Sequence, residues 1–132
     1  MLNELAEKIH TNAVAHGFYD DEKVNIPEKL MLIVTELGEA MEAYRNEHYA
    51  DLEEAINERV NIYLNKSVAD TTIESWNLTF EDFVKNTYED ELADTIIRIL
   101  DLCAYMKIDI DKHIMLKNKY NESRPYKHGK IC

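Results

Sequence analysis

Residues 27–46 read PEKLMLIVTELGEAMEAYRN, and this stretch decides the fold. Its apolar residues recur every three or four positions, which is the spacing of one face of a helix. Pro27 suits the first turn of such a helix, because that position needs no backbone N–H donor. We therefore expect a helix over residues 27–46 whose core-facing stripe is Leu30, Ile33, Val34, Leu37, Met41 and Tyr44.

Two pairs of acidic residues interrupt the apolar helices. Glu36 and Glu39 form the first pair, and Glu91 and Asp94 form the second. Residues three apart on a helix lie about 60° apart, so each pair shares a face. If the two pairs faced each other, four carboxylates would converge and repel one another unless cations lay among them. Oxygen ligands of this kind suit Mg²⁺.

An acidic pair on a helix more commonly belongs to a solvent-exposed face. Here both pairs lie in the most apolar helices of the chain. They also lie in the middle of those helices, away from an N-terminus where the helix dipole would stabilise negative charge. The context favours a metal site, with a solvated face as the alternative.

The remaining pattern is also helical. Three Gly and two Pro in 132 residues disfavour a turn-rich β fold. We expect one all-α domain over residues 1–132, an antiparallel helical bundle. Its other helices are predicted at 2–16, at about 51–66, at 79–106 with Thr79 and Asp82 at its N-terminal cap, and from Asp109 or Asp111 to about residue 120. Residues 69–78 are expected to form a loop or a short helix.

Composition excludes several functional classes. The net charge of −11 argues against binding to nucleic acid polymers and to anionic membranes. No stretch approaches the roughly 18 uninterrupted apolar residues of a membrane-spanning helix, and the first residues lack the pattern of a signal peptide. Cys103 and Cys132 are expected to be free thiols, as in a cytoplasmic protein.

Other residues allow two interpretations each. His10, His16 and Tyr19 are expected to be packing residues, or else to form a wall of a pocket for a nucleobase. Trp76 is expected to pack locally or to lie in a subunit contact. The C-terminal segment carries Arg124, Lys127, His128 and Lys130 against one acid, Glu122, so it is either a solvated tail or an anion-binding segment.

Three segments together resemble a known family. ELGEAMEAYR at 36–45, ELADTIIR at 91–98 and KYNESRPYKHGK at 119–130 are similar to motifs of the MazG-like nucleotide pyrophosphohydrolases. These belong to the all-α NTP pyrophosphohydrolase superfamily, with the dimeric dUTPases among their relatives. The resemblance covers residues 1–46 and 79–132.

The resemblance implies a four-helix core, a homodimer or homotetramer, and cleavage of an NTP or dNTP to the monophosphate and pyrophosphate. It implies Mg²⁺ as the cofactor, with Mn²⁺ able to substitute, bound by Glu36, Glu39, Glu91 and Asp94. Either Glu36 or Glu39 would accept the proton of the attacking water. Lys117, Asn121 and Arg124 would contact the phosphates and sugar. The connection from Glu39 to Glu91 is longer than in the family, so residues 47–78 are interpreted as a helical insertion.

Two other hypotheses remain from the residues alone. The chain could be a non-catalytic helical interaction module whose acids keep it soluble. It could also be a hydrolase of a modified nucleotide or a phosphoribosyl compound, built on the same metal site. A di-iron centre is disfavoured, because such centres in bundles use Glu-x-x-His pairs, and neither acidic pair is followed by a suitable His.

Overall fold

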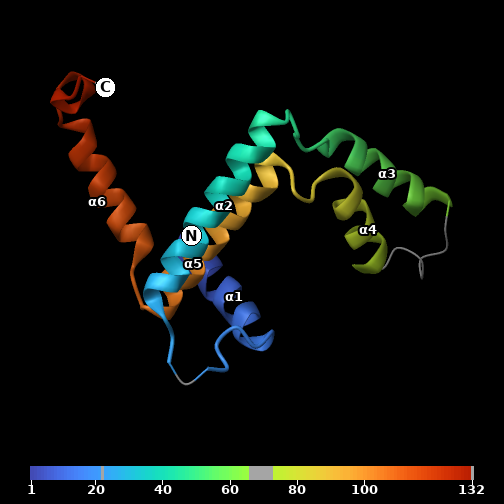
Figure 1. Cartoon of the computed structure of the whole chain (residues 1–132), viewed down its shortest axis with the longest axis horizontal. Coiled ribbons are helices and arrows are strands. Elements are labelled where there is room, and N and C mark those ends of the chain that lie inside the picture. The colour runs from blue at the N-terminus through green and yellow to red at the C-terminus, as the bar shows by residue number, and fades with distance from the viewer. Residues whose placement is uncertain (22, 66–72, 132) are drawn as a thin grey trace. The chain divides into compact units, whose positions relative to one another are not determined.

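The structure is a computed structural model that describes residues 1–21, 23–65 and 73–131 (Figure 1). It is all-α, as predicted, with no strand in the described residues. The helices are α1 (Leu2–Ala15), α2 (Ile26–Arg45), α3 (Leu52–Asn65), α4 (Ile73–Phe83), α5 (Tyr88–Tyr105) and α6 (Ile110–Glu122), followed by a 3₁₀ turn at Tyr126–Gly129. None of the described helices combines the length and the apolar character needed to cross a membrane.

The contacts within the chain group it into two compact units. The first unit is Met1–Lys29 with Ile97–Cys132, and the second is Leu30–Ile96. The division falls within α2 and within α5, so each of these helices contributes to both units. All four predicted carboxylate ligands belong to the second unit, and Lys117, Asn121 and Arg124 belong to the first.

The helix that carries the second acidic pair begins at Tyr88, later than predicted, so Glu91 lies in its first turn and the prediction that this pair lies in the middle of its helix is wrong. Thr79 is a buried residue inside α4 and does not cap a helix. The cap of α5 is Thr87, whose hydroxyl accepts a hydrogen bond from the backbone N–H of Asp90 at 3.4 Å. The Asp90 carboxylate in turn accepts from the backbone N–H of Asn86 at 2.8 Å. This pair of contacts satisfies N–H groups that a helix start leaves without partners.

In the second unit, α2 packs through a face of small and acidic residues. Ala40, Ala43 and Glu36 are its buried residues, and they share one face because they are spaced by four and three positions. On α5, Glu91 and Thr95 are buried. The second-unit parts of α2 and α5 approach each other where Glu36 lies close to Glu91 and Asp94.

The prediction that the apolar stripe of α2 faces the core is wrong for most of its members. Five of them, Leu30, Val34, Leu37, Met41 and Tyr44, are 48–56% exposed. Periodicity identified residues that share a face, but the face that packs within the chain is the neighbouring one. We call these five residues the α2 stripe.

The predicted insertion at residues 47–78 contains α3 and the first part of α4, which pack against each other. Three residues of this region are buried: Ala55 of α3, Thr79 of α4, and Val84, which follows α4. The chain entering α3 is fixed by backbone hydrogen bonds from Asp51 N–H to the Phe83 carbonyl (3.1 Å) and from Tyr88 N–H to the His48 carbonyl (2.9 Å). Trp76 contacts Phe80, with ring centroids 6.5 Å apart. Residues 69–72 of the predicted loop lie outside the described residues.

The first unit is built around a polar network centred on Asp101 of α5. The Asp101 carboxylate is 2.8 Å from Nδ1 of His10 in α1 and accepts a hydrogen bond from the Tyr19 hydroxyl at 2.6 Å. The Lys29 ammonium lies 3.9 Å from the same carboxylate and 4.0 Å from the centre of the Tyr19 ring. Tyr19 also stacks on Tyr105 at 5.2 Å. Burial and the Asp101 carboxylate raise the pKa of Tyr19 well above its usual value.

We expect Asp101→Ala to lower the free energy of unfolding by about 2–4 kcal/mol, because it leaves the partly buried groups of His10, Tyr19 and Lys29 without their shared acceptor. Urea denaturation followed by circular dichroism measures this. Glu7→Ala removes an exposed acid from α1 and serves as the matched control. A loss no larger than that of the control would show that the network does not hold the first unit together.

Candidate functional site

Three of the four predicted ligand carboxylates meet between α2 and α5. Glu36, Glu91 and Asp94 each offer a carboxylate oxygen within 4.8 Å of the others. Glu36 is 7% exposed and Glu91 is 5% exposed, whereas Asp94 is half-buried. Such a group could hold a metal ion, because it presents several anionic oxygens at one point.

Glu39, the fourth predicted ligand, lies at the edge of this group. Its side chain is exposed, and its carboxyl is a hydrogen-bonding neighbour of Glu91. The structure therefore brings both acidic pairs together, with three carboxylates in the group and Glu39 beside it in contact with solvent.

The surroundings of Glu91 disfavour its negative charge. Burial, followed by the neighbouring carboxyls of Glu39 and Glu36, raises the pKa of Glu91 from 4.5 to about 7. Both causes act in the same direction, since burial and like charges each favour the neutral form. At neutral pH, either a proton on Glu91 or a bound cation would reduce the repulsion among these carboxylates.

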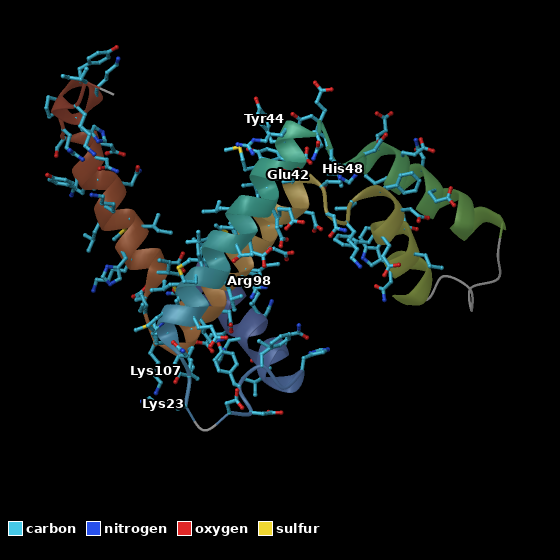
Figure 2. All side chains as sticks on the ribbon, in the orientation of Figure 1. Lys23, Glu42, Tyr44, His48, Arg98 and Lys107 are labelled. Atoms are coloured by element: carbon cyan, nitrogen blue, oxygen red, sulfur yellow. The ribbon has the colours of Figure 1, made fainter. Side chains whose placement is uncertain are left out.

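A hollow of about 430 Å³ adjoins the carboxylates. It is lined by Glu39 and Glu91 and, farther away, by Glu42, Ala43, Asn46, Glu47, His48 and Asn86. Figure 2 shows Glu42 and His48 at the C-terminal end of α2. Asn46 donates through its side-chain amide to the carbonyl and carboxylate of Glu42, at 3.0 and 3.2 Å.

His48 and Asn86, which line this hollow, were not predicted from the sequence to lie near the site. Both lie in short connections between helices, where no periodic pattern assigns a residue to a face. Only their positions just after α2 and just before α5, the helices that carry the acidic pairs, could have suggested them.

The predicted phosphate-binding residues are gathered on α6 and the segment after it, in the first unit. Lys117 and Asn121 line a shallow hollow of about 380 Å³ together with His113, Ile114 and Asn118. The Lys117 ammonium is 5.1 Å from the centre of the Tyr120 ring, and the Arg124 guanidinium is 5.5 Å from it. Two cationic side chains thus lie near one aromatic ring. The face of an aromatic ring attracts cations.

Asn121 and Arg124 differ in how their polar groups are used. The side-chain oxygen of Asn121 is buried and has no hydrogen-bond partner in the described part of the chain. The guanidinium of Arg124 donates a hydrogen bond to the His128 carbonyl at 3.3 Å, and a guanidinium carries five N–H donors in all. Tyr120, which connects Lys117 and Arg124, was not singled out from the sequence as part of this group.

Comparisons with protein-family models, with curated proteins and with solved structures gave no match. The functional argument therefore depends on the residues of this chain.

We expect the stability of the metal-free protein to fall as the pH rises from about 5 to 8. The pKa of Glu91 is raised in the folded state, so its proton stabilises the fold at low pH and is lost as the pH passes about 7. In EDTA at pH 8, Glu91→Gln should melt about 5 °C higher than the wild type, because it removes this repulsion.

The matched control is Glu58→Gln, which removes one exposed charge from α3. Differential scanning fluorimetry at pH 5.5 and pH 8 measures both variants. If Glu91→Gln and Glu58→Gln have the same melting temperature at both pH values, repulsion at Glu91 does not limit stability.

Proposed function

We propose that the protein is a cytoplasmic Mg²⁺-dependent pyrophosphohydrolase that cleaves a nucleoside triphosphate, NTP or dNTP, to the monophosphate and pyrophosphate. The observation that carries the proposal is the group of Glu36, Glu91 and Asp94, with Glu39 beside it. A scaffold that only needed soluble acids would not bury two of them against each other.

The donor set fits Mg²⁺, with Mn²⁺ as a substitute. All the donors are carboxylate oxygens, which hard divalent cations prefer, and Mg²⁺ is commonly held by a few carboxylates together with substrate phosphates. Glu36, Glu91 and Asp94 would bind the ion, with Glu39 completing the group. When bound, the ion neutralises phosphate charge and lowers the pKa of a water molecule.

The residues of the chain would divide the remaining work. Glu39 is the better candidate for the general base, since its carboxyl is exposed to solvent while Glu36 is buried. Lys117 and Arg124 would bind phosphate oxygens, Arg124 through its planar fork. The hollow beside Glu39 and Glu91 has a volume in the range of small-molecule sites, so it would take part of the nucleotide.

We also propose that the chain forms a homodimer or homotetramer through the α2 stripe. The spacing of Leu30, Val34, Leu37, Met41 and Tyr44 alternates between four and three residues, which is the spacing of a helix–helix seam. Gly38 borders the stripe, and apart from its chain neighbours and the nearby backbone of α2 itself, no described heavy atom lies within 4 Å of the position its Cβ would occupy. A second copy of the helix could therefore approach closely.

The α2 stripe also supports the second candidate function, a non-catalytic interaction module. Five half-exposed apolar side chains on one helix face are unusual for a surface that remains in water. A hydrolase of a modified nucleotide or a phosphoribosyl compound is the third candidate, and it would use the same carboxylates. The substrate panel separates the three.

The catalytic proposal is tested with a panel of NTPs, dNTPs, modified nucleotides and phosphoribosyl compounds in Mg²⁺, in which pyrophosphate and orthophosphate are both measured. We expect pyrophosphate and monophosphate as products. Release of orthophosphate alone would refute the cleavage position. An inactive wild type that still binds Mg²⁺ would favour the interaction module, and activity only on modified or phosphoribosyl substrates would favour the third candidate.

Two variants test the roles proposed for Glu36 and Arg124. Glu36→Gln should lower kcat on the order of 100-fold or more and remove most of the Mg²⁺-dependent rise in melting temperature, because it deletes a ligand. Arg124→Ala should raise KM about tenfold with a smaller loss of kcat, because it weakens phosphate binding. The opposite pattern, with kcat lost only in Arg124→Ala, would contradict the assignment.

The oligomer is tested by light scattering coupled to size-exclusion chromatography. Leu37→Asp should convert the wild-type oligomer to monomer, since it introduces a charge into the α2 stripe. Thr35→Asp adds the same charge at an exposed α2 position outside the stripe and should leave the oligomer intact. A monomeric wild type, or equal behaviour of the two variants, would exclude the stripe as the interface.

A further inference from the structure

The first turns of α1 and α6 are joined by hydrogen bonds. Asp111 of α6 accepts hydrogen bonds from the backbone N–H groups of Leu2 and Asn3 at 3.0 and 2.9 Å, and it lies 2.9 Å from the amine of Met1. These are donors that the start of α1 would otherwise leave without partners.

The reverse contact comes from Asn3 of α1. Its side-chain oxygen accepts from the backbone N–H groups of Ile110 and Asp111 at 3.0 and 3.4 Å, and its amide donates to Asp109 at 2.8 Å. We call Asn3, Asp109 and Asp111, with these contacts, the α1–α6 junction. Its hydrogen bonds hold the pKa of Asp111 down at about 2 and that of Asp109 below its usual value, so both acids are charged at neutral pH.

Along the rest of its length α6 is held weakly. None of its residues is buried, and the hydrogen bonds recorded between α6 and α1 all lie at their first residues. The other side-chain contacts described for α6 are local, such as Asn118 with Glu122 at 3.3 Å within the helix, and Tyr120 with Arg124 of the segment that follows it. The direction of α6 relative to α1 is therefore determined mainly at one end.

We infer that Asn3 and Asp111 are positioning residues for the phosphate-binding segment of α6. Arg124 follows Asp111 by 13 residues, so it lies about 20 Å along the helix direction from the junction. A tilt of about 10° at the junction would move it by about 3–4 Å, which is enough to lose a hydrogen bond. The part of this inference that concerns substrate rests on the proposed function.

The geometry is tested without any activity measurement. Nitroxide labels at Asn12 of α1 and Lys119 of α6, both exposed, are introduced in a chain with Cys132 replaced by Ser. We expect one narrow distance distribution by pulsed electron paramagnetic resonance, and a distribution at least twice as wide in Asp111→Ala. Glu4→Ala, which removes an exposed acid from the same turn of α1, should leave it narrow. An unchanged width in Asp111→Ala would overturn the inference.

The functional arm uses steady-state kinetics on the best nucleotide of the panel. Asp111→Ala and Asn3→Ala should each raise KM about tenfold with a smaller change in kcat, and the double variant should add little to either. Asp111→Asn keeps one carbonyl acceptor and should recover part of the loss. The Mg²⁺-dependent rise in melting temperature should be unchanged in all of them, because Glu36, Glu91 and Asp94 are intact.

The outcomes separate the two proposals. If the wild type hydrolyses no nucleotide, the proposed function fails, while the label distances still decide whether the junction directs α6. If the wild type is active and Asp111→Ala has a wide distance distribution with an unchanged KM, the positioning role is wrong. If Asp111→Ala does not fold, Asn3→Ala and Asp111→Asn supply the same two measurements.

Discussion

The structure depends on placing acidic side chains inside a helix–helix contact. Glu36 and Glu91 are nearly inaccessible to solvent and lie against each other and Asp94. Moving a carboxylate out of water is unfavourable unless a proton, a cation or a donor compensates. Each of these carboxyls has an oxygen within 4.8 Å of the others, so their negative charges repel. The raised pKa of Glu91 reports this constraint, and a divalent cation would relieve it while keeping the carboxyls charged.

The carboxylate group could be predicted because the spacing of two acids within one helix depends only on the local sequence. A spacing of three residues assigns both acids of a pair to one helix face in any fold, so Glu36 with Glu39 and Glu91 with Asp94 could be recognised before any packing was known. That the two pairs meet was a condition of the metal-site prediction, and only the resemblance of the motifs implied it. The same reasoning could not place Glu39 at the edge of the group, because exposure depends on how α5 crosses α2.

Other expectations were wrong where one local sequence pattern was compatible with two different structures. Thr79 and Asp82 have the spacing of a helix cap, but Thr87 and Asp90 satisfy the same pattern and form the real start of α5. The α2 stripe was expected in the core because apolar residues are usually buried. Within the chain α2 instead buries alanine and glutamate, and leaves the stripe half exposed. An apolar period shows which residues share a helix face, but it does not say whether the same chain buries that face.

Acidic and basic candidate residues are concentrated in different units of the chain. The second unit presents Glu36, Glu39, Glu91 and Asp94, while α6 in the first unit presents Lys117 and Arg124 around Tyr120. If the proposed function holds, a triphosphate would be repelled by carboxylates without a cation and attracted by cationic side chains such as those of α6. A divalent cation among the carboxylates reverses the first of these effects, so cation and nucleotide should each raise the affinity of the other by the same factor. This mutual effect requires a carboxylate group that repels the nucleotide until a cation neutralises the group. Exposed acids that only keep a protein soluble would not form such a group.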